Sequence, residues 1–152
     1  MPTIAASFPE AERKNAVSRG LLPGVVLYLS CPFTSPPKDK FIIVGDPDDP
    51  PLLVVINSAI HPYVQARPHL LQCQVLISAK AHTFLSHDSY ADCAHVEASM
   101  SLEEVRVQLE ADPSRIRGAV ATKSVADVLA ALSKASTVSP SHLVRITASL
   151  KV

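Results

Sequence analysis

Apolar residues form short continuous runs in the first part of the chain and recur at helical spacing in the last part. The runs of strand length lie at residues 25–29, 40–44 and 52–56, while 70–78 alternates in part and 81–99 is mixed. Continuous runs of about four to eight apolar residues are typical of strands that are buried on both faces or that belong to a curled barrel. We therefore predict a strand at 25–29, and at 40–44 and 52–56 strands that are either buried on both faces or part of a tightly curled barrel. We also predict a half-exposed strand at 70–78 and one or two short strands within 81–99.

Segments near the C-terminal end have the pattern of amphipathic helices. The first opens with Ser101 and Glu104 at capping-box spacing, the second with Ser124 as cap, and the third with Pro140 in its first turn. Leucine, isoleucine and valine then recur on one face of each segment. Helices are therefore expected at these three places.

Strands precede helices along the chain, apart from one short N-terminal helix with Ser7 as its cap. The stretch 61–69, which contains two prolines, is expected to be loop. This order predicts the α+β class, with a small curled antiparallel sheet and helices packed outside it. We expect a single domain over residues 1–152, mainly β-barrel at 21–100 and mainly helical at 101–152.

Composition places the 152-residue chain among globular proteins, with 47% hydrophobic and 18% charged residues. Its 14 basic and 14 acidic residues give a formal net charge of zero, which argues against a nucleic-acid binder held mainly by counterion release but leaves room for a local basic site. Widely spaced Cys31, Cys73 and Cys93, with no CxxC pair, predict reduced thiols in a cytoplasmic protein. We expect no signal peptide, because the N-terminal stretch contains acidic residues and no long apolar core. We also expect no membrane partner, because no apolar run approaches the length that spans a bilayer.

Two of the apolar runs are joined by the stiff acidic segment "GDPDDPP" at 45–51, which predicts an antiparallel hairpin. Counting back from this turn places Phe41 opposite Ile56. The same register gathers four polar side chains at the open end of the hairpin: Lys38, Lys40, Asn57 and Ser58. A cation with amide and hydroxyl donors suits a phosphodiester. The alternative is that the lysines keep strand ends soluble and that Asn-Ser forms a turn.

Six segments of the chain, spread over residues 22–135, occur in a characteristic order. They are "LPGVVLYL", "KDKFIIV", "LLVVINS", "HDSYADCAHVEA", "RIRGAV" and "SVADVLAAL". In this order they resemble the PemK/MazF-like family of toxin endoribonucleases. The resemblance implies a small SH3-like (PemK/MazF-type) antiparallel β-barrel with flanking and C-terminal helices, usually a homodimer. It also implies cleavage of single-stranded RNA without metal or cofactor, by attack of the ribose 2'-hydroxyl on the adjacent phosphate, and an antitoxin protein as partner.

The resemblance maps the family's catalytic pair onto the open end of the hairpin. Lys40, or Lys38 if the loop shifts, stands where the family has an Arg, and Ser58 stands where it has Thr or Ser, with Asn57 beside it. The chain departs from the family in lacking that Arg, in carrying "CPFTSPP" in place of a Gly- and Gln-containing loop, and in the added segment 101–114. Three interpretations remain open: a toxin with altered specificity, a member with another acid–base pair, or a barrel without catalysis.

Histidines supply further candidates for acid and base, because their pKa lies near neutrality. The candidate catalytic residues are Lys40, Ser58, Lys38, His61 and His87. The candidates for substrate binding are Asn57, Phe33, Tyr63, His82 and Tyr90, whose aromatic members would stack on unpaired bases. His82, His87 and Asp88 lie close in sequence but match no zinc signature, so no metal site is predicted.

Two other functions stay open at this point. A non-catalytic SH3-like barrel that binds RNA or a protein partner is favoured by the missing Arg. An unrelated α+β hydrolase that uses His with Ser or Cys is favoured only by the six histidines. Cys93 and His95 would share a strand face, but the sequence identifies no third group to orient them.

Overall fold

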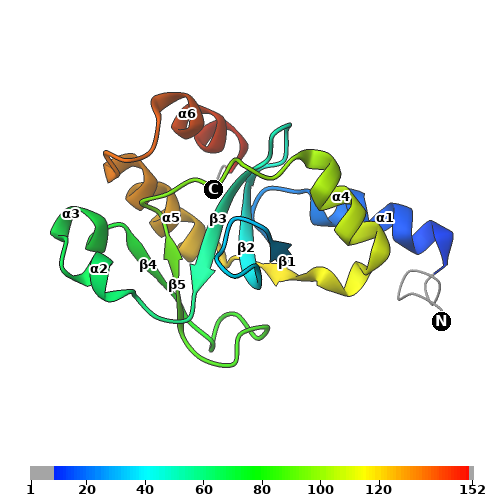
Figure 1. The fold of residues 1–152 in the computed structure, drawn as a ribbon, viewed down its shortest axis with the longest axis horizontal. Coiled ribbons are helices and arrows are strands. Elements are labelled where there is room, and N and C mark those ends of the chain that lie inside the picture. Colours follow the sequence, from blue (N-terminus) through cyan, green and yellow to red (C-terminus); the bar gives the residue numbers. More distant parts are fainter. Residues whose placement is uncertain (1–8, 151–152) are drawn as a thin grey trace.

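One six-stranded antiparallel sheet forms the centre of the fold in the computed structural model, which describes residues 9–150 (Figure 1). Its strands are β1 (Val25–Cys31), β2 (Lys38–Asp46), β3 (Leu52–Asn57), β4 (Gln74–Ile77), β5 (Ser89–Asp92) and β6 (Ile116–Ala119). They lie in the order β4-β5-β3-β2-β1-β6, so β4 and β6 are the two edges. The predicted α+β class and antiparallel sheet are confirmed, and the sheet is curled but open at these edges.

Helices flank the sheet at both ends. They are α1 (Glu10–Gly20), α2 (Pro62–Gln65), α3 (Pro68–Leu71), α4 (Leu102–Ala111), α5 (Thr122–Lys134) and α6 (Pro140–Ser149), with a 3-10 turn, η2, at Pro113–Arg115. The loop predicted at 61–69 is wrong, because this stretch contains α2 and the start of α3. Pro62 and Pro68 each begin a helix, where a proline has no N–H to lose and its fixed φ suits the helical turn.

Side-chain caps begin two of the predicted helices. Ser101 Oγ accepts a hydrogen bond of 3.1 Å from the Glu104 N–H at the start of α4. Ser139 caps α6 in the same way. The cap predicted at Ser124 is wrong, because α5 begins earlier, at Thr122. The cap predicted at Ser7 lies outside the described residues.

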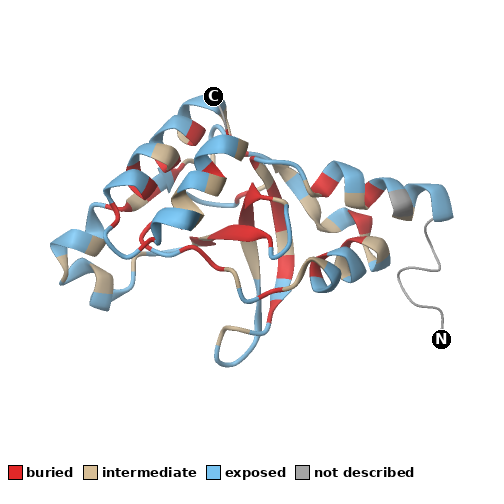
Figure 2. Cartoon of the chain, turned by 90° about the horizontal axis from the view of Figure 1, so that it is seen from above, coloured by how far each residue is buried: buried red, intermediate tan, exposed pale blue. Residues whose placement is uncertain are grey.

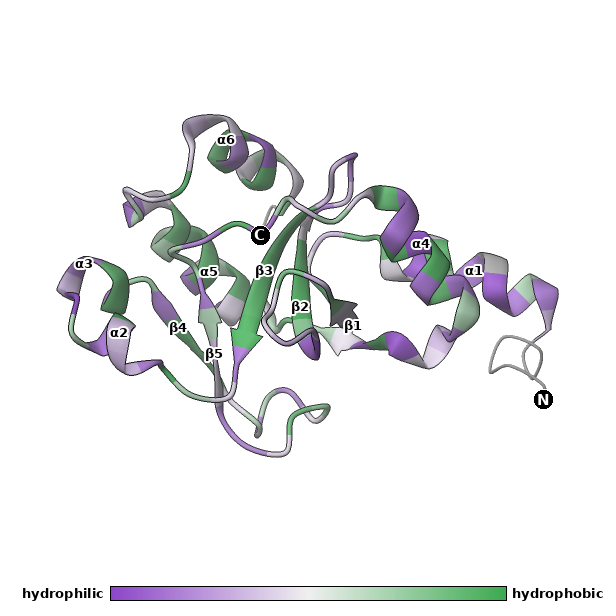
Figure 3. Cartoon of the chain, viewed as in Figure 1, coloured by the Kyte–Doolittle hydropathy of each residue, from purple (hydrophilic) through white to green (hydrophobic). Residues whose placement is uncertain are grey.

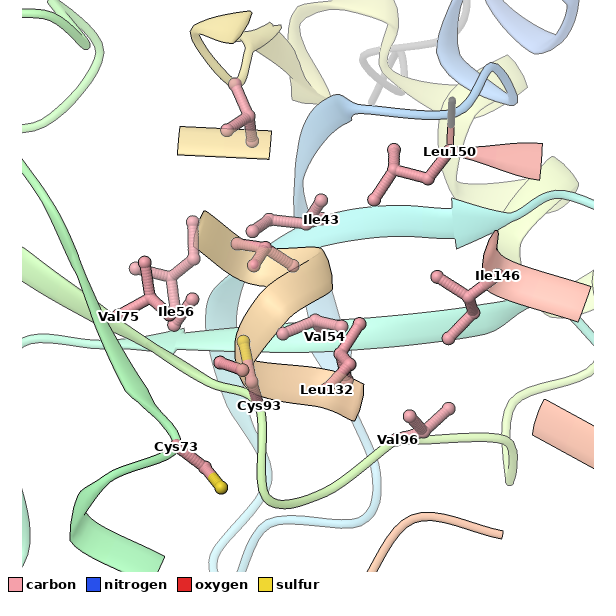
Figure 4. Packing of buried hydrophobic residues seen from close by; sticks show 14 of the residues in the cluster. Ile43, Val54, Ile56, Cys73, Val75, Cys93, Val96, Leu132, Ile146 and Leu150 are labelled. Atoms are coloured by element: carbon pink, nitrogen blue, oxygen red, sulfur yellow. The ribbon is translucent and has the colours of Figure 1, made fainter. Parts of the chain in front are cut away.

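One face of the sheet packs against α5 and α6. Ile43, Val54 and Ile56 from β2 and β3 contact Leu132 of α5 and Ile146 of α6 in one hydrophobic cluster (Figure 4). Since successive side chains of a strand point to opposite faces, this set fixes which residues of each strand face the other side. Figure 2 shows that the buried residues follow the strands and the inner sides of the helices.

The opposite face packs against α1 and α4 over only part of its width. A second cluster joins Ile42 and Leu53 of the sheet to Ala16 of α1 and to Val105 and Leu109 of α4. These helices lie on the β1 side, away from β4 and β5 (Figure 1). Hydrophobic residues run along β2 and β3 and give way to hydrophilic ones at the open end of their hairpin (Figure 3). The part of this face near β4 and β5 is therefore where polar groups gather.

Candidate functional site

The open end of the β2–β3 hairpin brings together the polar residues that the sequence places there. Phe41 pairs with Ile56 across the two strands, which is the predicted register. One position further out, Lys40 Nζ donates a hydrogen bond of 2.5 Å to Asn57 Oδ1. Ser58 follows β3 directly and is exposed. The predicted grouping of a cation, an amide and a hydroxyl is therefore present.

Lys40 carries its charge in a partly buried position. Burial lowers the pKa of its ammonium below the ordinary value of 10.5, and the charge of nearby Lys38 lowers it further. Lys38 is exposed and lies two positions earlier on the same face of β2. The two lysines concentrate positive charge at one end of an otherwise apolar hairpin, which favours an anionic group such as a phosphate.

A cavity of about 280 Å³ opens on one face of the sheet at this end. Its apolar side is formed by Tyr28, Phe41, Ile56 and Leu85. The ring centroids of Tyr28 and Phe41 lie 4.7 Å apart. Its polar side is formed by Ser86, His87 and Ser89. We call this the aromatic cavity. Rings beside hydroxyl groups suit a planar ligand that also carries polar edges.

A second cavity, of about 400 Å³, lies on the opposite face of the sheet. Lys40 and Asn57 face this side, because Phe41 and Ile56 next to them face the other. Its walls include Asp92 of β5, Gln74 of β4 and the segment 58–62. We call this the acidic cavity, after Asp92. The two cavities share Lys40 and Ser58, so the predicted catalytic pair lies where they meet.

His61 and His87 lie on opposite sides of this junction, His61 in the acidic cavity and His87 in the aromatic one. Nδ1 of His61 accepts a hydrogen bond of 3.0 Å from the Tyr63 N–H, so the proton of the neutral ring is on Nε2. Nδ1 of His87 donates to the Asp88 carbonyl at 2.8 Å, so Nε2 of its neutral ring has a free lone pair. In the neutral rings, the two Nε2 atoms therefore offer one hydrogen-bond donor and one hydrogen-bond acceptor.

Two of the residues predicted to bind substrate take part in packing. His82 is 1% exposed, its Nδ1 donates to the Ser78 carbonyl at 2.9 Å, and its Nε2 accepts from the Ala121 N–H at 3.0 Å. This ring joins the loop before β5 to the start of α5 and has no ring nitrogen left for a ligand. Phe33 packs against the hydrophobic cluster beneath α1 and α4. Neither residue lines either of the two cavities.

The remaining aromatic candidates lie nearer the site. Tyr63 is 56% exposed at the start of α2, and the guanidinium of Arg67 lies 3.4 Å from its ring centroid. Tyr90 pairs with Asn57 across β5 and β3, so it shares the face of the acidic cavity. Both stay candidates for stacking on bases.

Asp92 and Gln74 belong to the site, although sequence reasoning did not place them there. They are register partners of β5 and β4, and Gln74 Nε2 donates to Asp92 Oδ1 at 2.9 Å. The alternation within 70–78 indicates only that Gln74 lies on a polar strand face. Its place in the same cavity as Lys40 depends on β5 lying between β3 and β4, which no local pattern reveals.

Other reactive groups lie apart from this arrangement or are shielded. Within residues 9–150, no group of three or more His, Cys, Asp or Glu side chains is placed to hold a metal ion. Cys31, Cys73 and Cys93 are free and buried, and burial raises the pKa of the Cys31 thiol to about 11, which makes it a poor nucleophile at neutral pH. None of the described helices combines the length and the apolar character needed to cross a membrane.

No protein-family model matches the chain, and a search of curated proteins finds no match. Any function is therefore inferred from the geometry of the residues at the open end of the hairpin.

Proposed function

We propose that this protein is a PemK/MazF-like endoribonuclease toxin that cleaves single-stranded RNA without a metal ion. The observation that carries the proposal is the bond between Lys40 and Asn57 at the junction of the two cavities, with Ser58 in the walls of both. A phosphate at this junction would meet a partly desolvated ammonium, an amide and a hydroxyl. The nucleotides on its two sides would enter the two cavities.

The order of elements supports the proposal at the level of the fold. β1, β2 and β3 follow one another as antiparallel neighbours, and α5 follows β6 as "SVADVLAAL" follows "RIRGAV". On this basis we assign the curled sheet to the SH3-like, PemK/MazF type. A homodimer and an antitoxin partner belong to the same proposal and rest on the family likeness alone.

In the proposed reaction the ribose 2'-oxygen attacks phosphorus, so that the O2'–P bond forms and the P–O5' bond breaks. The products are a 2',3'-cyclic phosphate and a 5'-hydroxyl end. His87 Nε2, with its free lone pair, accepts the proton of the 2'-hydroxyl and becomes an imidazolium. His61 enters the step as an imidazolium and donates its Nε2 proton to the departing O5', which leaves it neutral. Its Nδ1 accepts from the Tyr63 N–H once the proton of the neutral ring is again on Nε2. Lys40 and Ser58 stabilise the charge that develops on the non-bridging phosphate oxygens.

Asn57 has a positioning role in this mechanism. A lysine is a point charge on a flexible stem and cannot hold a phosphate through two parallel N–H bonds as an arginine does. By accepting a hydrogen bond from Lys40, Asn57 restrains the ammonium at the junction of the cavities. The pair thus supplies part of the orientation that a single guanidinium would provide.

A non-catalytic barrel that binds RNA or a protein is the second candidate. The lysine in place of the family's arginine favours it, because a lysine cannot make the bidentate contact with phosphate that an arginine makes. The same two cavities would then hold a ligand without cutting it.

Cleavage of a fluorescent single-stranded RNA by the purified protein in the presence of EDTA tests the proposal. Lys40→Ala and Ser58→Ala are each expected to slow cleavage by about 100-fold or more, and His61→Ala and His87→Ala by roughly 100- to 10,000-fold. Lys123→Ala removes an exposed lysine of α5 and serves as the charge-matched control. New 5'-hydroxyl ends should appear with the wild type and this control.

Two other outcomes would change the conclusion. RNA that stays intact with the folded wild type would leave the binding barrel as the better account. Cleavage that survives in both Lys40→Ala and Ser58→Ala but disappears in the histidine variants would mean that the protein is a nuclease whose catalytic site does not include Lys40 and Ser58. Circular dichroism of each variant separates loss of activity from loss of fold.

A further inference from the structure

We infer that the acidic cavity is a base-recognition subsite in which Asp92 selects an RNA base that carries an exocyclic amino group and disfavours uracil. This inference rests on the proposed function, since it concerns a nucleotide next to the phosphate at Lys40 and Ser58. It adds Asp92 and Gln74, which the proposed reaction does not use.

The position of the cavity supports a nucleotide as its occupant. It has a volume of about 400 Å³, within the range of about 300 to 1,000 Å³ that is usual for small-molecule sites. Lys40 and Ser58 lie in its wall, together with Asp92 and Gln74. A ligand that places a phosphate at Lys40 and Ser58 and extends a base along the sheet would reach Asp92 and Gln74.

Hydrogen bonds hold the Asp92 carboxylate in a fixed orientation. Oδ1 accepts from Gln74 Nε2 at 2.9 Å and from the Ala94 N–H at 3.2 Å. Within the described part of the chain, no hydrogen-bond donor is found for Oδ2. One carboxylate oxygen is therefore held by the protein while the other can accept a hydrogen bond from a ligand.

The neighbouring amides have fixed orientations too. Gln74 Nε2 donates to Asp92 Oδ1 and to the Leu70 carbonyl at 3.2 Å, so Gln74 Oε1 is left as an acceptor. Asn57 Oδ1 accepts from Lys40, which can only donate, so Asn57 Nδ2 is left as a donor. The cavity thus presents two acceptors and one donor from three side chains.

This set of groups distinguishes between bases. A carboxylate accepts a hydrogen bond from the amino group of cytosine, and adenine and guanine carry amino donors of their own. Uracil has a carbonyl oxygen where cytosine has its amino group, and this oxygen would face the Asp92 carboxylate and repel it. One well-placed base contact contributes roughly 1 to 3 kcal/mol of discrimination, which corresponds to about 5- to 150-fold in affinity.

Binding of two uncleavable RNAs tests the inference. Hexamers of 2'-O-methyl cytidine and of 2'-O-methyl uridine carry the same phosphates but lack the nucleophilic hydroxyl, so fluorescence anisotropy compares the bases alone. The wild type should bind the cytidine hexamer about tenfold more tightly. In Asp92→Asn the Oδ1 bonds can persist while an NH₂ donor replaces Oδ2, so the preference should vanish or reverse. Asp48→Asn, on the exposed β2–β3 turn, removes the same charge and should keep the preference.

Each remaining outcome gives a decision. Equal affinity of the wild type for both hexamers, with RNA still cleaved, overturns the inference and leaves the proposed function standing. An unchanged preference in Asp92→Asn also overturns it. Absence of both binding and cleavage overturns the inference together with the proposed function. If Asp92→Asn does not fold, the wild type decides the matter: replacing adenine by purine in an adenosine hexamer removes only the amino group and must weaken binding severalfold.

Discussion

Lys40 is a charged residue whose environment is set by both burial and neighbouring charges. Its ammonium is half-buried at the end of a hydrophobic hairpin, bonded to Asn57 and close to the charge of Lys38. Burial and the like charge both disfavour its protonated form, which is why its pKa lies below the ordinary value. A phosphate bound at this position would relieve both effects. The charge of Asp92 acts in the opposite sense and already stabilises the ammonium in part, as a bound anion would.

Replacing Lys38 by Ala should raise the pKa of the Lys40 ammonium toward 10.5, because a neighbouring like charge is removed while the burial stays. NMR titration of the Lys40 side-chain resonances measures this shift. Lys80→Ala removes an exposed lysine of the loop before β5 and should leave the titration unchanged. Identical Lys40 titrations in wild type and Lys38→Ala would contradict the prediction.

The closed end of the β2–β3 hairpin is held by a contact between elements far apart in the sequence. Arg145 of α6 donates from Nε to Asp46 Oδ2 at 2.7 Å and from Nη2 to the Pro50 carbonyl at 2.9 Å. Asp46 is buried at the end of β2. A buried carboxylate without its partner is costly, so α6 restrains the hairpin whose opposite end carries the candidate site.

Arg145→Met should lower the free energy of unfolding by roughly 1 to 3 kcal/mol, because it leaves the buried Asp46 carboxylate with fewer donors. Urea denaturation measures the change. Arg106→Met is the control: Arg106 makes only exposed contacts of 3.6 Å with Glu103 and Glu110 on α4, so the loss there should stay within about 0.5 kcal/mol. Equal losses in both variants would show that the contact with Asp46 does not anchor α6.

At the scale of the whole molecule, the two hydrophobic clusters share one sheet. β1, β2 and β3 place alternate residues in both clusters, with α5 and α6 on one face and α1 and α4 on the other. If β1, β2 and β3 unfold, the apolar residues of both clusters are exposed to water. The described residues should therefore unfold as one cooperative unit, as expected of a small single domain.

Amide signals of Ala16 in α1 and Ala131 in α5 should disappear at the same urea concentration, because each reports one cluster. Leu109→Ala and Leu132→Ala each open a cavity in one cluster. Each should lower the free energy of unfolding by about 2 to 5 kcal/mol and so move both transitions together to a lower urea concentration. NMR intensities during the titration provide the measurement. Separate midpoints for the two alanines would mean that α1 and α4 form an independent unit.

The sequence by itself determined the local features of this protein. The register that sets Lys40 against Asn57 follows from two apolar runs and the stiff turn between them, because the length of the turn determines which residues lie opposite each other. The starts of α4 and α6 follow from serine caps that act within one helical turn. These features depend on neighbours a few residues away, so the pattern of the chain was enough to predict them.

Only the tertiary structure decided which distant segments meet. Asp92 and Gln74 line one cavity with Lys40 because β5 is inserted between β3 and β4. His82 is a buried structural residue whose ring accepts a hydrogen bond from the Ala121 N–H at the start of α5. Such pairings come from competition among all the strands and helices for the same hydrophobic surface. The physical reason is that the hydrophobic effect is non-directional: any two apolar faces gain free energy when they pack together. The sequence pattern of one segment therefore does not specify its partner.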